Sequence, residues 1–98
     1  MVVVINKKGK INQLAKKLRI SSQPKRIEIL CFLFDNQDVC VSDIAKALRL
    51  SIAVASYHLQ ALAKENLVVS NRKGKMICYR LSPEKFANDL KKLICKYK

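Results

Sequence analysis

Apolar residues in the N-terminal third of the chain recur with the spacing of helices. The first set predicts an amphipathic helix over about residues 8–19 and consists of Ile11, Leu14, Ala15 and Leu18. After a break at residues 21–23, Pro24 suits the first turn of a second helix. The face of this helix that we expect to point inward carries Ile27, Leu30, Cys31 and Phe34. A polar turn at residues 35–38 ends it.

Two short helices are predicted next, each with a serine at its start. Ser42 is expected to cap the first of them, and Asp43 suits its positive N-terminal end. Its inward positions are Ile44, Ala47 and Leu48. Ser51 is expected to cap the other, which reaches about Glu65 and turns Ala55, Leu59 and Leu62 inward. Because only a brief turn at residues 49–50 separates them, the two form a helix-turn-helix pattern.

Beyond residue 66 the period of the pattern changes from helix to strand. Ile77, Tyr79 and Leu81 alternate with Met76, Cys78 and Arg80, and residues 67–71 provide a partner strand. Gly74 supplies the positive φ that a tight hairpin turn needs. On this pattern Cys78 faces outward and receives no role.

A last helix is expected to start at Ser82-Pro83-Glu84 and to keep helical spacing to the end. Its apolar residues are Phe86, Leu90, Leu93, Ile94 and Tyr97. The order of elements is four helices, a hairpin and a helix. We therefore predict a mainly α fold with a small β-hairpin, a winged helix-turn-helix, as one domain over residues 1–98.

The charge of the chain indicates what this fold would bind. The 98 residues include 20 Lys and Arg against 7 Asp and Glu, a formal net charge of +13, and half of them are apolar. That apolar content supports a core and excludes a disordered tail. Residues 1–35 (8 basic, 2 acidic) and 72–98 (9 basic, 2 acidic) are strongly basic, whereas residues 36–71 (3 of each) are neutral. Nucleic acid is the expected partner of such a domain.

Several other classes of protein are disfavoured. No apolar run is long enough to span a bilayer, so no membrane partner is expected. The four apolar residues at 2–5 precede lysines and do not form a secretory signal, so we expect a cytoplasmic protein whose cysteines stay reduced. A single histidine, with no phosphate-binding glycine loop, paired carboxylates or CxxC motif, argues against an enzyme and against a bound cofactor.

The fourth predicted helix has the outer face of a helix that reads DNA. Ser56 and Gln60 can donate and accept hydrogen bonds, and glutamine can pair with both hydrogen-bonding groups of adenine. Tyr57 offers a hydroxyl and a flat ring, and Ala53 can contact a thymine methyl group. Arg72, Lys73 and Lys75 at the hairpin tip are expected to contact phosphates or the minor groove. His58, beside the inward stripe, is expected to pack or hydrogen-bond within the protein rather than to bind a ligand.

These residues carry a resemblance to a known family. The segment DVCVSDIAKALRLSIAVASYHLQALAKENLVVSNRKGKMICYRL, with PKRIEIL before it, resembles the ArsR/SmtB family of winged-helix repressors over about residues 22–82. The resemblance implies a homodimer, joined by its first and last helices, that represses transcription by binding an imperfect palindrome in double-stranded DNA until an effector releases it. It also implies that Ser51, Ala53, Ser56, Tyr57 and Gln60 read bases while Arg72, Lys73 and Lys75 hold the backbone.

The family divides by the signal that it senses, and two cysteine arrangements are relevant. DVCVSD resembles the family's ELCVCD metal box but lacks its second cysteine: Cys40 remains, while that position holds Ser42, a poor ligand for soft metals. A metal sensor using Cys40 is therefore the less favoured alternative. PKRIEILCFL resembles the second helix of the persulfide and redox sensors, which carry another cysteine near the end of the last helix. Cys31 and Cys95 occupy those positions, so thiol oxidation or persulfidation that links them is the expected release mechanism.

Two further alternatives remain open at the level of sequence. Cys31 can simply fill the core, which leaves an ArsR-like protein that binds DNA constitutively or architecturally with no thiol switch. A winged helix can also serve as a protein-interaction module. DNA affinity that falls steeply with salt separates the DNA-binding functions from that module.

Overall fold

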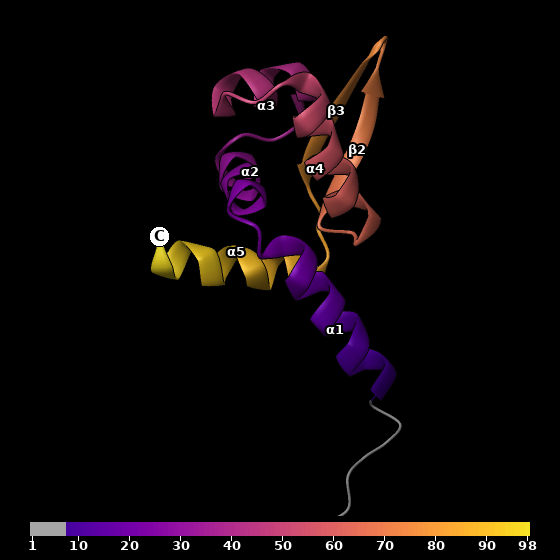
Figure 1. Cartoon of the computed structure of the whole chain (residues 1–98), viewed down its shortest axis with the longest axis vertical. Coiled ribbons are helices and arrows are strands. Elements are labelled where there is room, and N and C mark those ends of the chain that lie inside the picture. Colours follow the sequence, from indigo (N-terminus) through magenta and orange to yellow (C-terminus); the bar gives the residue numbers. More distant parts are fainter. Residues whose placement is uncertain (1–7) are drawn as a thin grey trace, which may run out of the picture.

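The structure is a computed structural model that describes residues 8–98, so the apolar run at residues 2–5 lies outside it. The described chain has the predicted winged helix-turn-helix architecture (Figure 1). In order, its elements are α1 (Lys8–Ser21), α2 (Pro24–Asp35), β1 (Val39–Cys40), α3 (Val41–Leu48), α4 (Ile52–Lys64), β2 (Val68–Lys73), β3 (Met76–Leu81) and α5 (Lys85–Tyr97).

The core lies where α2, α3 and α4 meet the sheet and α5. Its fully buried side chains include Ile29, Leu30, Leu33, Ile44, Leu59, Leu62, Leu67 and Val68. The stripe predicted for α4 is confirmed, since Ala55, Leu59 and Leu62 are all inaccessible to solvent. Burial of these side chains, at roughly 1.5–3 kcal/mol for each large one, fixes α4 against the body of the protein.

Two of the predicted helix faces are rotated in the structure. In α2 the buried residues include Arg26, Ile29 and Leu33, while Ile27 and Cys31 are only half-buried. In α3, Ala45 is buried beside Ile44, and Ala47 is exposed. Both helices have apolar residues on more than one face. Tertiary packing therefore determines which face is buried.

Of the two serine caps predicted at helix N-termini, one is confirmed and one is wrong. Ser51 caps α4 as predicted, because its Oγ accepts a hydrogen bond from the Val54 backbone N–H at 3.1 Å. The predicted cap of α3 by Ser42 is wrong: α3 begins at Val41, and Cys40 occupies the N-cap position without a side-chain bond. Arg49, in the left-handed conformation, ends α3 and opens the turn toward α4.

The sheet has one strand more than the sequence indicates. Its order is β1-β3-β2 with antiparallel pairing throughout, and Gly74 (φ 64°) forms the predicted turn between β2 and β3. β1 pairs Val39 with Tyr79 and Cys40 with Cys78. The expectation that Cys78 faces outward is wrong, because β1 pairs with the middle of β3 and Cys78 is fully buried there.

α1 and α5 present apolar residues to solvent. α1 leads away from the body of the molecule, and α5 crosses beneath α2 (Figure 1). The exposed apolar side chains of these two helices are Ile11, Leu14, Leu18, Leu93 and Tyr97. Both helices therefore carry surface that a single copy of the chain leaves uncovered. Among residues 8–98, no helix has the length and apolar character needed to cross a membrane.

Candidate nucleic-acid interface

The outer face of α4 presents the residues that the sequence selected. Ser51, Ala53, Tyr57 and Gln60 are exposed and Ser56 is half-buried. Tyr57 is 66% exposed, an unusual position for a large aromatic side chain with no role. The Gln60 amide donates to Ser56 Oγ at 3.0 Å, so these two side chains hold each other in place. No Asp or Glu lies within α4, which leaves this face free of negative charge.

The wing, which consists of β2, β3 and their turn, adds positive charge beside this helix. Arg72, Lys73 and Lys75 are all exposed at its tip. The charge of Lys73 is partly neutralised, because its Nζ lies 2.6 Å from Asp38 Oδ2 in the turn before β1. The hydrogen bond from Lys73 is the main reason that the pKa of Asp38 is lowered from its usual value. Arg72 and Lys75 form no ion pair within residues 8–98, so they remain available to an anion.

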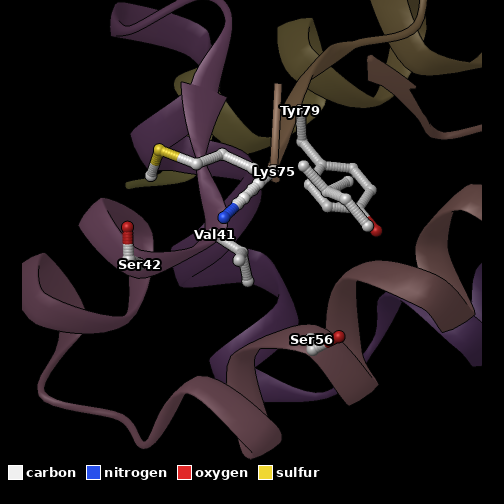
Figure 2. A pocket seen from close by; sticks show the side chains of 7 residues that line it. Val41, Ser42, Ser56, Lys75 and Tyr79 are labelled. Carbon is white, nitrogen blue, oxygen red and sulfur yellow. The ribbon is translucent and has the colours of Figure 1, made fainter. Parts of the chain in front are cut away.

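A hollow of about 250 Å³ lies between α4, the start of α3 and the wing (Figure 2). Its lining is mostly apolar with a few polar groups, and consists of Val41, Ser42, Ser56, Lys75, Met76, Ile77 and Tyr79. The hollow therefore joins Ser56, a predicted base-reading residue, to Lys75, a predicted phosphate-binding residue. Both residues contribute to one concave surface.

A buried arginine positions the aromatic residues of α4. Arg26 of α2 is only 3% exposed; its Nε donates to His58 Nδ1 at 3.1 Å and its Nη1 to the Ile20 carbonyl at 3.0 Å. Its guanidinium also lies 5.7 Å from the centre of the Tyr57 ring. Burial, with the Arg26 charge as a smaller cause, lowers the pKa of His58. His58 thus has the hydrogen-bonding role within the protein that we predicted.

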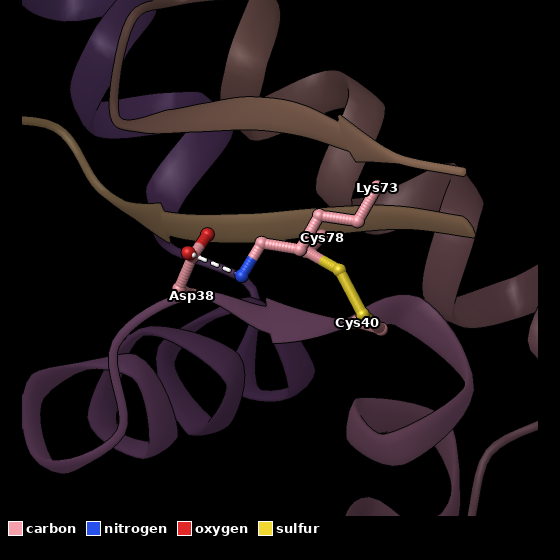
Figure 3. Close-up of a disulfide and its surroundings, with 4 residues drawn as sticks. All are labelled: Asp38, Cys40, Lys73 and Cys78. Atoms are coloured by element: carbon pink, nitrogen blue, oxygen red, sulfur yellow. Dashed lines mark ion pairs between the residues drawn. A yellow bond between two sulfur atoms is a disulfide. The ribbon is translucent and has the colours of Figure 1, made fainter. Parts of the chain in front are cut away.

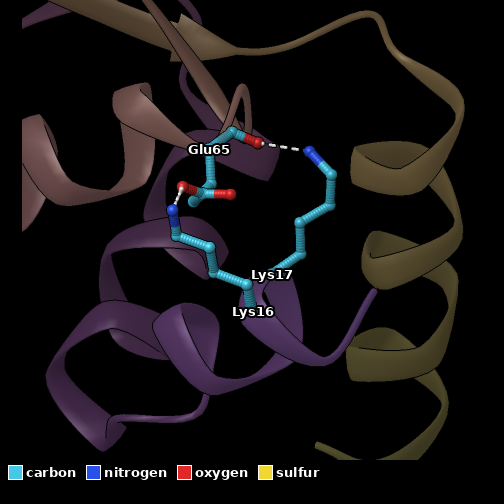
Figure 4. A network of polar contacts seen from close by, with 3 residues as sticks. All are labelled: Lys16, Lys17 and Glu65. Atoms are coloured by element: carbon cyan, nitrogen blue, oxygen red, sulfur yellow. Dashed lines mark hydrogen bonds and ion pairs between the residues drawn. The ribbon is translucent and has the colours of Figure 1, made fainter. Parts of the chain in front are cut away.

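A second polar contact connects α1 to the carboxyl end of α4 (Figure 4). Lys17 Nζ donates to the Glu65 main-chain carbonyl at 2.8 Å, and Lys16 Nζ lies 3.5 Å from the Glu65 carboxylate. Cationic groups are favourable at this end of a helix, where carbonyl groups lack partners within the helix. The two lysines therefore help to hold α1 against the carboxyl end of α4.

The cysteines are not all reduced thiols, contrary to our expectation. Cys40 and Cys78 form a disulfide between β1 and β3, since the register of the two strands places them opposite each other. A disulfide sulfur is not a thiolate ligand, so Cys40 in this state cannot serve the metal-sensor alternative. Within residues 8–98, no three His, Cys, Asp or Glu side chains gather as a metal site would require.

The other two cysteines are free thiols. Cys31 is half-buried against the core in α2, and Cys95 is exposed near the end of α5. The bond that we predict between them is therefore not formed in this structure, although α2 and α5 pack against each other. Their function as a switch stays a prediction.

Comparisons with known proteins agree with this geometry. Residues 23–70 match the family model described as bacterial regulatory protein, arsR family. The HTH-type transcriptional regulator YgaV of Escherichia coli is 32% identical over 72 residues, which cover 74% of this chain and 73% of that protein. The cadmium resistance transcriptional regulatory protein CadC of Listeria innocua is 34% identical over 70 residues. That match covers 71% of this chain, which spans about three fifths (59%) of that relative's length. These relatives are regulators and not enzymes, as predicted.

A solved structure supports the fold assignment independently. The homodimeric winged helix-turn-helix DNA-binding domain Mb0332 from Mycobacterium bovis superimposes with a TM-score of 0.79 at 27% sequence identity. The superposition covers 98% of this chain and 84% of that one. The likeness therefore includes α1 and α5, beyond the segment that the family model matches.

Three features of the site were not predicted from the sequence. Arg26 was not identified, although its spacing from Ile29 and Leu33 places it on their side of α2 and is a usable signal. The pairing of Asp38 with Lys73 joins residues 35 apart along the chain. The same holds for Cys40 and Cys78, which are separated by 38 residues. No local pattern reveals contacts of this kind.

Proposed function

Because the chain belongs to the ArsR family of bacterial regulatory proteins, we propose that it is a homodimeric transcriptional repressor that binds a specific sequence of double-stranded DNA. One observation carries the proposal. The acid-free face of α4 exposes Tyr57 and Gln60 beside a wing whose Arg72 and Lys75 are not engaged in ion pairs within the described chain. A helix with short polar side chains can enter the major groove while the wing cations reach the adjacent phosphates.

The individual residues would divide the work by chemistry. Gln60 would pair with an adenine edge, Ala53 would contact a thymine methyl group, and Tyr57 would supply a hydroxyl and a ring face. Ser51 and Ser56 would add hydrogen bonds to bases or phosphates. Arg72, Lys73 and Lys75 would contribute binding energy that does not depend on the sequence of the DNA.

The uncovered faces of α1 and α5 supply the surface for a dimer. Two copies joined through these helices would present two α4 helices to one side of a duplex. An imperfect palindrome with half-sites one helical turn apart is the expected target. The Mb0332 domain from Mycobacterium bovis is homodimeric, which supports this arrangement.

The test begins with selection of duplexes from a random pool and compares the affinity for the selected duplex with that for a scrambled one. The proposal predicts a preference of at least 10³-fold for the selected duplex, in the range typical of specific binders. Gln60→Ala should cost about 1–3 kcal/mol and relax the preference at one base pair in each half-site. Gln23→Ala, in an exposed position before α2 that makes no cap bond, is the matched control and should change nothing. Equal affinity for both duplexes would favour the architectural alternative, and no affinity the protein-interaction module.

We further propose that Cys31 and Cys95 release the protein from DNA when they become linked. Cys95 is exposed and can take up a sulfur atom from polysulfide, giving a persulfide. The Cys31 thiol can then attack this persulfide, which leaves a disulfide and expels hydrogen sulfide. Support comes from the packing of α2 on α5 and from the greater exposure of Cys95 than of Cys31.

This switch is tested by measuring the intact mass of the protein and its affinity for the selected duplex, each before and after treatment with polysulfide. The switch predicts a loss of two hydrogens at Cys31 and Cys95 with a loss of affinity, and no response in Cys31→Ser or Cys95→Ser. If both variants still respond, the assignment is wrong. Unchanged binding by a modified wild-type protein would favour a constitutive repressor.

A further inference from the structure

The disulfide between Cys40 and Cys78 lies at the junction of the wing and the helix-turn-helix (Figure 3). Cys40 is the residue immediately before α3, the first helix of that motif. Cys78 is in β3, the central strand of the sheet and one side of the wing. The bond therefore joins the two parts of the protein that are expected to contact the same DNA duplex.

Few other interactions join β1 to the wing, although the inner parts of β2 and β3 also pack against the helices through Val68, Tyr79 and Leu81. β1 has two residues, so its ladder with β3 consists of the Val39–Tyr79 and Cys40–Cys78 pairs. The ion pair between Asp38 and Lys73 lies beside this ladder and is half-exposed to solvent. Exposed ion pairs contribute little, about 0–1 kcal/mol, and a two-residue strand is weakly held on its own. The covalent bond is accordingly the strongest restraint between β1 and the wing.

Solvent reaches the two sulfur-bearing residues unequally. Cys78 has no exposed surface, whereas Cys40 is half-buried. A small thiol is therefore expected to attack the disulfide at the Cys40 sulfur. Its thiolate forms a bond to the Cys40 sulfur, the disulfide breaks, and the electron pair goes to the Cys78 sulfur, which takes up a proton. A second thiol molecule then attacks the mixed disulfide, releases the Cys40 thiol and leaves as the oxidised low-molecular-weight disulfide.

The reverse reaction is favoured by the same geometry. Whenever β1 and β3 pair in the reduced protein, their register places the two thiols opposite each other. A low-molecular-weight disulfide can then exchange first with Cys40, after which the Cys78 thiolate closes the bond and displaces the second thiol. Closure of the bond then selects this paired arrangement from those that the mobile wing samples.

We propose that Cys40 and Cys78 form a reversible thiol–disulfide site, separate from Cys31 and Cys95, that sets the mobility of the wing and so tunes affinity for DNA. The inference rests on the proposed DNA-binding function. With the bond closed, the wing is held in the position described here, and Arg72 and Lys75 are arranged for binding in advance. With the bond open, binding has to order the wing at an entropic cost, so affinity falls.

The experiment uses the full chain in a Cys31→Ser/Cys95→Ser background, so that one thiol pair alone can react. The protein is equilibrated in a series of mixtures of reduced and oxidised glutathione. Alkylation followed by intact-mass measurement counts the free thiols, and anisotropy measures affinity for the selected duplex in each mixture. We expect affinity to rise roughly tenfold as the bond closes and to fall again when reductant is added. Amide hydrogen exchange over residues 72–77 should slow in parallel.

Cys40→Ala/Cys78→Ala in the same background is the second variant. It should bind DNA like the reduced protein, and its affinity should not depend on glutathione. The reduced and oxidised forms of the Cys31→Ser/Cys95→Ser protein provide a comparison that requires no substitution at Cys40 or Cys78. Affinity that is equal in both states, or a pair that never changes state across the series, would overturn the inference and leave the DNA-binding function intact. Absence of specific binding in both states would overturn the DNA-binding function itself.

Discussion

Arg26 and His58 form a hydrogen bond that requires a neutral imidazole. Nδ1 of His58 accepts from Arg26 Nε at 3.1 Å, so the ring proton resides on Nε2. A protonated ring would have no acceptor to offer and would place two positive charges side by side. The contact thus links the charge state of one side chain on α4 to the packing of α4 on α2.

The first prediction concerns acid sensitivity of folding. The pKa of His58 is lowered in the folded protein, so between that value and about 6.5 the unfolded chain binds more protons. The contribution is fully present above about pH 6.5 and is lost as the pH falls toward the lowered pKa. Urea unfolding at pH 7.5 and 5.5 should show reduced stability at the lower pH. His58→Asn, whose amide oxygen can still accept from Arg26 and does not titrate, should show a smaller decrease.

The second prediction concerns the exposed face of α1. Leu14→Glu introduces a charge between Ile11 and Leu18, and should convert the proposed dimer to a monomer in sedimentation experiments because the charge buried in the interface would lack a partner. Helical content should stay the same, since Leu14 is 47% exposed within one chain. Asn12→Glu makes a similar change of charge at an exposed polar position of the same helix and should leave the dimer intact. A Leu14→Glu protein that sediments as a dimer would show that α1 is not in the interface.

The third prediction concerns the wing cations. Lys75→Ala should reduce the slope of log affinity against log salt by about 0.9 for each phosphate that the lysine neutralises in the wild-type complex. Lys73→Ala should have a smaller effect, because Asp38 already neutralises part of the Lys73 charge. Asp38→Asn should have the opposite effect and strengthen binding, since it releases Lys73. Asparagine also tolerates the left-handed backbone that residue 38 adopts (φ 62°). Equal slopes for the Lys73 and Lys75 variants would show that the ion pair opens on binding.

The fourth prediction separates two roles of Ser51. Ser51→Ala removes the bond to the Val54 N–H and should cost about 1 kcal/mol of stability. Ser51→Asp should keep the cap, because a carboxylate oxygen accepts the same bond and suits the positive end of the helix. The aspartate should nevertheless weaken DNA binding more than the alanine, since its charge faces the phosphates. An aspartate variant that binds like wild type would place residue 51 outside the interface.

The parts of the structure that the sequence predicted are those that local interactions determine. The Ala55–Leu59–Leu62 stripe, the Ser51 cap and the Gly74 turn each depend on residues within a few positions of one another. In contrast, the inward face predicted for α2 differs from the observed one. Residues 29–34 are all apolar, so the period of the pattern cannot indicate which side of the helix is buried. Only the packing of α2 against α4 and α5 determines which side is buried.

The contacts of the site that the sequence did not predict also depend on tertiary structure. β1 is too short to give an alternating pattern, so its pairing with β3 and the opposition of Cys40 and Cys78 follow from tertiary structure alone. The residues on the outer face of α4 were identified because an amphipathic helix specifies its exposed side as soon as its buried side is known.

The hydrogen bond from Lys17 to the Glu65 carbonyl has a consequence for the spacing of the half-sites in the DNA target. It anchors the helix that is expected to pair with a second copy to the end of α4. In a dimer joined through α1, this contact would therefore help to set the distance between the two α4 helices before DNA binds. Successive major grooves on one side of a duplex recur about every 34–36 Å. We expect such a dimer to prefer half-sites at one spacing. Roughly five base pairs inserted between them, half of a helical turn, would move the second half-site to the opposite side of the duplex.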